Sequence, residues 1–453
     1  MQLQKATWLL CLLAPACASS DTSYREPIEA WQESRAQRWD AAQQNPDNGS
    51  NGTLAADAQL PELLAYGRQH NPKLSVAFYR WQSAVEQIPQ ASKLPEPRVM
   101  FGAFLEEVET RTGPMQGKVS ISQALPWFGK RSLAGDVATV RAQAMAEGVE
   151  IAFLEVDRQI KDVWYEYAWL QQAQRVAHAH QDLLGHWQKV ARTRLELGLS
   201  QPSEILRVEL ELGQLDDRFL SLEDLERPLR AKLNAALNRP SDAVLAEPTY
   251  PLAAVEEVDV PTLLASLSET NPRLRQLKRE VEAAQHGLTL AGKAGYPDFS
   301  LGVDYTFIGS NSAAGSGEDA VALTFGLSLP VWRGAYRAQR EGARAQMHAA
   351  RASLESTRHT LVAELEMALF KLRDASRQLV LLNTSLIPKG QEAVGTMGST
   401  YQSGDASFID VIDAQRLLLE FQLQAVRAEA DRAQALAKVE EISGVSLSTS
   451  QNF

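Results

Sequence analysis

Residues 63–74 read LLAYGRQHNPKL and residues 263–274 read LLASLSETNPRL, so the chain carries one pattern twice, 200 residues apart. The repeat continues beyond this stretch. At the same spacing, Pro97 and Gly102 correspond to Pro297 and Gly302. At nearly the same spacing, Leu125-Pro126-Trp127 corresponds to Leu329-Pro330-Val331-Trp332 and Gly198 to Gly404. Length alone suggests about three domains. A duplication of this size instead predicts one structure built from two similar halves.

The N-terminus has the pattern of an export signal. Lys5 precedes a short apolar run over residues 6–14, and small residues around Cys17 fit cleavage sites. We expect a signal peptide over residues 1–18 and a flexible segment over 19–56. Cys11 and Cys17 are the only 2 cysteines, so we expect no disulfide in the mature chain. Cys17 is a candidate lipidation site, and an ordinary signal peptide is the alternative.

Composition and motifs exclude several classes of protein. The net charge of −11 is spread along the chain and offers no basic patch for nucleic acid. An acidic balance suits a conduit for cations, although many soluble proteins share it. The sequence has no phosphate-binding loop, nucleophile motif or His-Glu-x-x-His pattern. We therefore expect no enzyme activity, no cofactor and no resident metal, and we expect His178 and His180 to lie at the surface.

Two segments with period-2 alternation predict hairpins. Apolar residues alternate with small or polar ones over residues 299–307 and 321–329, and more weakly over residues 98–124. A half-buried hairpin of a soluble protein gives the same pattern. No segment after the leader has 18 consecutive apolar residues, so we expect no transmembrane helix. An exported chain without such a helix can enter a membrane only as a closed β-barrel. Lipid offers no hydrogen-bond partners, so every backbone N–H and C=O group must be paired within the protein. One chain supplies too few strands, so several chains are needed.

Most of the remaining sequence has the spacing of coiled-coil helices. Residues 131–197 and 334–402 contain apolar residues every 3 or 4 positions and no internal proline except Pro388. As single helices each would be roughly 100 Å long. Shorter helices are expected over residues 72–93, 203–238, 272–294 and 406–442. The first structural repeat then spans residues 57–250 with a hairpin at about 98–124. The second spans 251–445 with a hairpin at about 298–330, and a tail follows at 446–453.

Residues 120–131 read SISQALPWFGKR, and a second landmark places Tyr401 and Gly404 before the run DVIDAQ at 410–415. With these motifs the chain resembles the TolC-like outer membrane efflux proteins over roughly residues 57–445, and most of all their heavy-metal branch. The resemblance implies a mainly α fold with a small β part. It implies a homotrimer with a long coiled-coil α-barrel and a 12-stranded membrane β-barrel, four strands coming from each chain.

The resemblance also implies a function and partners. The trimer would be a passive exit duct in the outer membrane lipid that extends into the periplasm. A periplasmic adaptor, also called a membrane fusion protein, would connect it to an inner-membrane transporter of the RND type. Heavy-metal cations are the expected cargo. The alternatives are a duct for drugs or other small molecules, or a periplasmic coiled-coil scaffold that is not a channel.

Two turns between long helices are expected at the periplasmic tip. Glycine suits a helix C-cap, and serine or aspartate suits an N-cap. Capping alone therefore explains these residue types. The family positions indicate in addition that the turns contact the adaptor. The candidate contact residues are Arg194, Leu195, Gly198, Ser200, Gly404 and Ser407.

Four residues near the tip are candidates for a gate. Asp410 and Asp413 are 3 residues apart and share one helix face, so a trimer would collect six carboxylates around its axis. A solvated acidic helix face is the alternative. Tyr401 and Glu204 match family positions that join neighbouring helices in the closed state. An arginine that completes the lock in the family is replaced by Ala406, and Arg207 is a candidate substitute.

Overall fold

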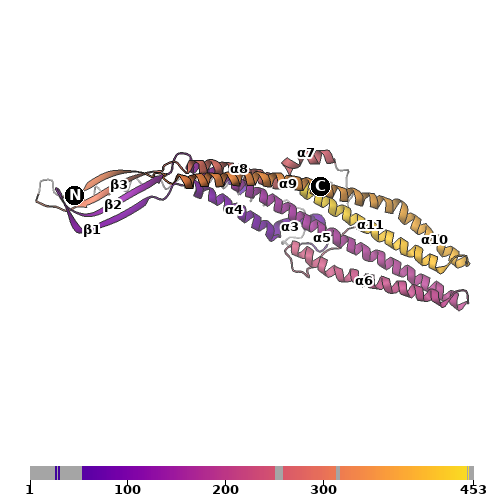
Figure 1. Ribbon diagram of the computed structural model, residues 1–453. Coiled ribbons are helices and arrows are strands. Elements are labelled where there is room, and N and C mark those ends of the chain that lie inside the picture. Colours follow the sequence, from indigo (N-terminus) through magenta and orange to yellow (C-terminus); the bar gives the residue numbers. More distant parts are fainter. Residues whose placement is uncertain are drawn as a thin grey trace. The chain divides into compact units, whose positions relative to one another are not determined.

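The computed structural model describes residues 54–249, 259–312, 317–445 and 447, and also residues 26, 27, 29 and 30. The described chain is mainly helical with one four-stranded sheet, as predicted (Figure 1). It divides into two units. Residues 80–142 and 282–347 form the first, and residues 54–79, 143–281 and 348–445 belong to the second. The predicted signal peptide, Cys17, the C-terminal tail and most of the flexible segment lie outside the described residues.

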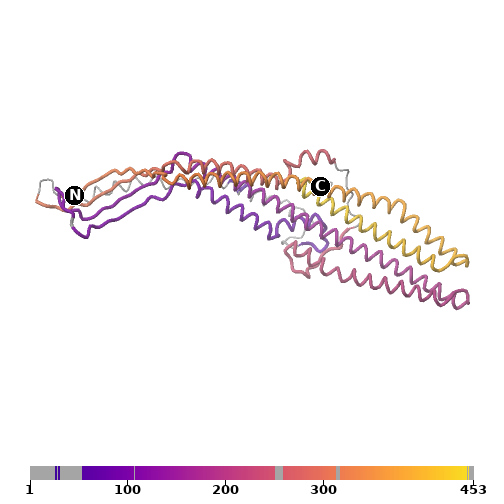
Figure 2. Tube along the Cα trace, in the orientation of Figure 1, coloured from indigo at the N-terminus to yellow at the C-terminus, as the bar shows by residue number. Residues whose placement is uncertain are grey.

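The first unit contains an antiparallel sheet. Its strands are β1 Arg98–Thr110, β2 Gly113–Leu125, β3 Phe299–Ile308 and β4 Ala320–Leu327, hydrogen-bonded in that order. β1 and β2 form the hairpin of the first repeat, and β3 and β4 form that of the second. β2 pairs with β3, so the two hairpins lie side by side in one sheet (Figure 2). β1 and β4 are left as the sheet edges within one chain.

Register separates the sheet into two chemically different faces. Val99 pairs with Ile121, which pairs with Val303, which pairs with Leu323, so one row of apolar residues crosses all four strands. The next row on the opposite face contains Ser120 beside Asp304. Lys118 also lies on that face, where its ammonium is 3.2 Å from the Asp304 carboxylate. Alternation along β2, β3 and β4 therefore gives one apolar face and one face of small or polar residues, whereas β1 places the apolar Met100 on the second face beside Ser120.

The chain leaves the sheet through the Leu-Pro-Trp-Phe-Gly-Lys run. The Asp298 carboxylate accepts hydrogen bonds from the Trp127 backbone N–H at 2.7 Å and from the Lys130 ammonium at 2.8 Å. The Trp127 ring stacks on Tyr296 and Phe299, with centroids 5.3 and 5.5 Å apart. The motif thus fixes where the strands end and the helices begin in the first unit.

The helices follow the predicted lengths closely. They are α3 Leu60–His70, α4 Pro72–Ser92, α5 Lys130–Glu196, α6 Pro202–Ala236, α7 Val260–Thr270, α8 Pro272–Lys293, α9 Arg333–Leu381, α10 Ile387–Ser403 and α11 Phe408–Ser443. The apolar heptad positions are buried along most of their length, with Val156, Ile160 and Leu365 fully covered. Among the described residues, none of the helices holds a stretch long and apolar enough to cross a membrane.

One predicted helix is interrupted. Residues 334–402 were expected to form a single helix, but a π-helical segment, Leu382–Leu386, separates α9 from α10. Pro388 lies two residues after this segment and has no N–H to donate, and its ring would clash with the carbonyl oxygen four residues earlier in a regular helix. A π-helical turn accommodates this mismatch locally. The prediction of one continuous helix was therefore wrong at the single proline that the sequence showed.

The repeated Asn-Pro pairs form matching junctions in the second unit. The buried Asn71 amide donates to the Ala236 carbonyl oxygen at 2.7 Å, and the Asn271 amide donates to that of Ile442 at 2.7 Å. Each asparagine also accepts a backbone N–H at the start of the next helix. Each junction therefore ties the end of a return helix to the start of a short helix, and the two Asn-Pro pairs have the same local structure.

Candidate functional site

The turn between α5 and α6 begins with a left-handed glycine. Gly198 has φ of 71°, which is unfavourable for any residue with a Cβ atom. The Leu199 backbone N–H donates to the Arg194 carbonyl oxygen at 2.8 Å, and Ser200 donates its hydroxyl to the Ala191 carbonyl oxygen at 3.2 Å. Gln201, not a serine, occupies the N-cap of α6 and makes no side-chain capping bond. Ser200 therefore fastens the turn to α5 and does not cap α6.

The turn between α10 and α11 has both expected caps. Gly404 has φ of 93°. Ser407 is the N-cap of α11 and accepts the Ile409 N–H at 3.1 Å. The Asp410 carboxylate accepts the Ser407 backbone N–H at 3.2 Å, which completes a capping box. Asp410 thus helps to cap α11, a role separate from its predicted place in the gate.

Contacts between the two turns bring several predicted residues together in the second unit. Arg194 donates to the Gln402 carbonyl oxygen at 2.9 Å, and its guanidinium lies 4.6 Å from the centroid of the Tyr401 ring. Figure 1 shows the two turns at the same end of this unit. Arg194 thus connects the two turns within a single chain.

The Tyr401 hydroxyl donates a hydrogen bond to the Glu204 carboxylate, with an oxygen–oxygen distance of 2.6 Å. Tyr401 is only 2% exposed and packs against Phe408, with ring centroids 5.1 Å apart. Burial raises the pKa of the Tyr401 hydroxyl well above its usual range, and the bond to Glu204 raises it further. The tyrosine therefore stays protonated and links α10 to α6.

The acidic pair Asp410 and Asp413 is exposed on α11. Neither carboxylate is buried in the single chain, so both are free to face water. A nearby cation was missed from the sequence. Arg416 on α11 forms an ion pair with Glu211 on α6. Arg207, the candidate substitute for the missing arginine, forms no ion pair among the described residues. Glu211 lies one heptad after Glu204, so both face the same side of α6. This spacing could have indicated Glu211 as a second residue that contacts α11.

A row of polar side chains is buried between α5 and α11. His180 is 4% exposed and lies 2.7 Å from the Gln422 amide oxygen, so the prediction of a surface histidine was wrong. Burial lowers the pKa of this imidazole. One heptad further toward the turns, Trp187 Nε1 and both polar atoms of Gln415 are buried without a hydrogen-bond partner in this chain. His178, in contrast, is exposed, as expected.

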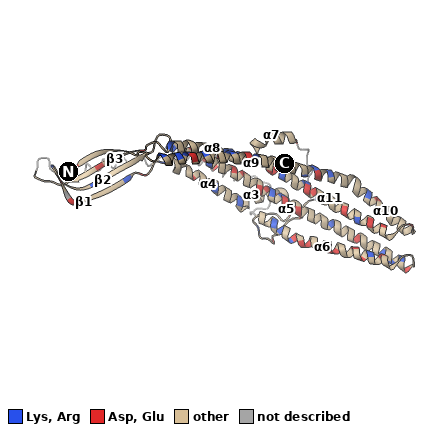
Figure 3. Ribbon diagram, viewed as in Figure 1, with Lys and Arg blue, Asp and Glu red and all other residues tan. Residues whose placement is uncertain are grey.

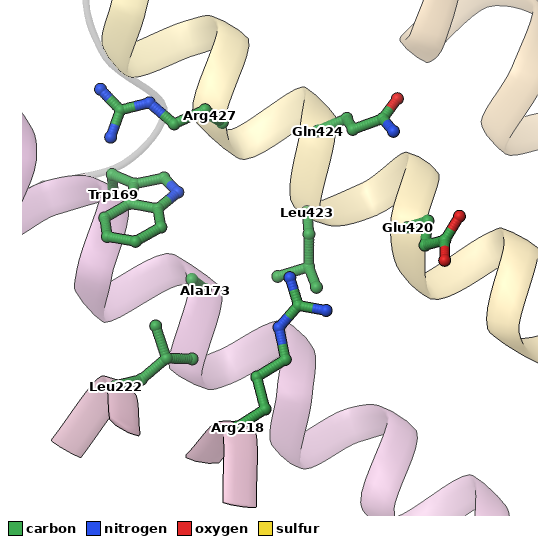
Figure 4. A pocket seen from close by; sticks show the side chains of 8 residues that line it. All are labelled: Trp169, Ala173, Arg218, Leu222, Glu420, Leu423, Gln424 and Arg427. Atoms are coloured by element: carbon green, nitrogen blue, oxygen red, sulfur yellow. The ribbon is translucent and has the colours of Figure 1, made fainter. Parts of the chain in front are cut away.

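A small cavity of about 270 Å³ lies between α5, α6 and α11 (Figure 4). Trp169 forms one wall, and the Arg427 guanidinium lies 5.1 Å from its ring centroid. Both Glu166 carboxylate oxygens accept from Arg427 at 2.9 Å, so this arginine is held in place. Within the described residues no cluster of histidine, cysteine or acidic side chains has the arrangement of a metal site.

Comparison with known proteins gives a consistent answer. Residues 263–445 match the Outer membrane efflux protein family. The cobalt-zinc-cadmium resistance protein CzcC of Cupriavidus metallidurans is 23% identical over 400 residues, covering 87% of this chain and 90% of that protein. The outer membrane protein VceC of Vibrio cholerae is 20% identical with a TM-score of 0.73, covering 86% of this chain and 97% of that one. The Campylobacter jejuni CmeC channel is 14% identical with a TM-score of 0.72, covering 90% and 92%.

The fold and the matched residues define a TolC-like channel. Residues 263–445 belong to the outer membrane efflux protein family, and the chain as a whole has the TolC-like fold of outer membrane efflux channels that extend into the periplasm. Members of this family are channels, in agreement with the prediction that the chain is not an enzyme. The four-stranded sheet and the long helices of the two repeats are those of this fold.

Proposed function

We propose that this channel is the passive exit duct of a tripartite efflux system for heavy-metal cations. The observation that carries the choice of cargo is the similarity to a cobalt-zinc-cadmium resistance protein, which extends over 87% of the chain. In this proposal the duct itself does little to discriminate between substrates. The absence of a chelating cluster among the described residues fits a role in which cations pass through without being held.

A homotrimer is supported by apolar surfaces that one chain leaves uncovered. On α6 the side chains of Leu206, Leu210 and Leu220 are exposed, and on α9 those of Met367 and Phe370 are exposed. Apolar helix faces of this kind mark contacts with other chains. The sheet also has two open edges, which are unstable in lipid unless they pair. Three copies would pair these edges and cover the helix faces together.

The tip residues would control passage. In this proposal Tyr401 and Glu204 hold the two helical hairpins of one chain together in the closed state, with the Arg416–Glu211 pair adding a second link. Asp410 and Asp413 from three chains would form a ring of six carboxylates at the narrow end. Rings of acidic side chains favour cations and bind divalent ions.

The same tip would bind the periplasmic adaptor, and an inner-membrane transporter of the RND type would supply the energy. The exposed apolar side chains Leu197 and Leu199 beside Gly198 support this assignment, because a turn between helices otherwise needs no apolar residues at its apex. Arg194, Leu195, Ser200, Gly404 and Ser407 would shape this contact surface.

Cargo is tested in cells that lack the gene. Restoring the channel should restore growth in cobalt, zinc and cadmium and leave tolerance of dyes and hydrophobic drugs nearly unchanged. Restored tolerance of drugs alone would replace the metal proposal with the small-molecule duct.

The acidic ring is tested in planar bilayers. The double change Asp410→Asn and Asp413→Asn removes six charges per trimer, so cation preference and block by divalent ions should both fall. The single change Asp413→Asn is the matched control for capping, because it leaves the Asp410 cap intact. Wild-type selectivity and block in the double variant would show that both residues only face solvent.

A further inference from the structure

The apolar face of β4 extends past the end of the strand. Every second residue from 321 to 331 is apolar and exposed: Val321, Leu323, Phe325, Leu327, Leu329 and Val331. The intervening residues Ala322, Thr324, Gly326 and Ser328 are small, and Pro330 follows them. The strand itself ends at Leu327, and the Val331 backbone N–H donates to the Leu329 carbonyl oxygen at 2.9 Å, so the chain turns between the strand and α9. Alternation of bulky apolar and small residues is the pattern of a strand that faces lipid. The bulky side chains therefore mark the side of the sheet that contacts lipid.

An aromatic residue stands where this apolar stripe ends. Trp332 is 76% exposed, and Phe128, in the loop that leaves β2, is 78% exposed. The loop with Phe128 is anchored, since the Lys293 ammonium donates to the Phe128 carbonyl oxygen at 3.0 Å. Tyr336 in the first turn of α9 packs over Gly295. Exposed tryptophan and phenylalanine on a fixed backbone are typical of the boundary between hydrocarbon and headgroups.

Cations follow immediately on α9. Arg333, Arg337 and Arg340 are spaced by 4 and 3 residues, so they lie on one helix face. All three are exposed. Among the described residues none of the three has an acidic partner, whereas Arg344, one turn further on, pairs with Glu341 at 3.0 Å. In Figure 3 the ribbon shows several blue Lys and Arg positions near the start of α9.

We propose that Arg333, Arg337 and Arg340, below Trp332, form a binding surface for anionic phospholipid headgroups of the periplasmic leaflet. Charge complementarity supports an anionic lipid as the partner. The chain has a net charge of −11, yet three arginines without acidic partners lie together at the start of α9. Continuity supports it as well, since the apolar stripe, Trp332 and the arginines follow one another in the order hydrocarbon, boundary and headgroup. The surface would fix the depth and tilt of the channel in the membrane.

The experiment uses the detergent-solubilised full-length protein and measures binding of phosphatidylglycerol and phosphatidylcholine, both with short chains, by native mass spectrometry. The wild type should prefer phosphatidylglycerol. Each cation near an anionic surface strengthens binding about fivefold, so R333Q/R337Q/R340Q should lose about 100-fold of that preference. The variant R333K/R337K/R340K keeps the charges and should retain the preference.

A matched control removes three other exposed arginines, R192Q/R358Q/R373Q, with the same change in net charge. It should bind phosphatidylglycerol like the wild type. Equal loss in this control, or no preference in the wild type, would overturn the proposal. Altered ion selectivity of R333Q/R337Q/R340Q in bilayers with unchanged lipid preference would place the arginines in the tunnel and also overturn it.

Discussion

Replacing Tyr401 by phenylalanine tests whether the bond to Glu204 holds the channel closed. The substitution removes one hydroxyl and keeps the ring that packs against Phe408. The lost hydrogen bond is 2.6 Å long and its acceptor is a carboxylate. Bonds to charged groups contribute about 1.5–3 kcal/mol. Because Glu204 is partly exposed and water can replace its lost partner, the lower part of this range applies best.

If opening breaks this bond, Tyr401→Phe should raise the ratio of open to closed channels about 10-fold, and at most about 150-fold. The assay is open probability in planar bilayers at fixed voltage and salt concentration. Tyr165→Phe is the matched control, because it removes a partly buried tyrosine hydroxyl from α5 that does not contact Glu204. Equal open probability in Tyr401→Phe and the wild type would refute the reasoning.

The same bond predicts how the closed state responds to pH. The pKa of Tyr401 is raised in the folded chain, so the protonated hydroxyl is the favoured form. Its contribution is complete below the ordinary tyrosine pKa of about 10 and is lost only as pH rises through the higher folded value. Titration of this tyrosine should therefore leave open probability unchanged between about pH 6 and 9. A transition within that window that Tyr401→Phe abolishes would contradict the assignment.

Three further changes test the fold around the site. Asn271→Ala should lower the free energy of unfolding by about 2–4 kcal/mol, because it leaves the buried Ile442 carbonyl oxygen and Leu274 N–H unpaired, and thermal unfolding measures this. Gly404→Val should cost about 1 kcal/mol or more at φ of 93° and reduce crosslinking to the adaptor, while trimer yield stays normal. The lowered pKa of His180 stabilises the neutral form, so stability should fall as pH drops below about 6.5, and His180→Gln should remove that dependence. An identical pH profile in His180→Gln would show that another group is responsible.

Local periodicity determined most of the architecture. Alternation with period 2 identified the strands around residues 299–307 and 321–329, and apolar residues at 3- and 4-residue spacing identified the long helices. Both signals survive in the sequence because each element must bury one continuous face. Gly198 and Gly404 also indicated the turns from the sequence alone, because a positive φ strongly favours a residue without a Cβ atom. The sequence showed Pro388 as a possible site of a helix break, but it did not show the π-helical turn that accommodates this proline.

Pairing between distant residues was decided only by the tertiary structure. Tyr401 and Glu204 are 197 positions apart, and family resemblance, not any local pattern, suggested that they meet. The burial of His180 against Gln422, and the ion pair of Arg416 with Glu211, depend on the relative register of α5, α6 and α11. A shift of one residue along a helix turns a side chain by about 100°. The sequence therefore determines which residues form helices and strands, and packing determines which polar side chains become partners.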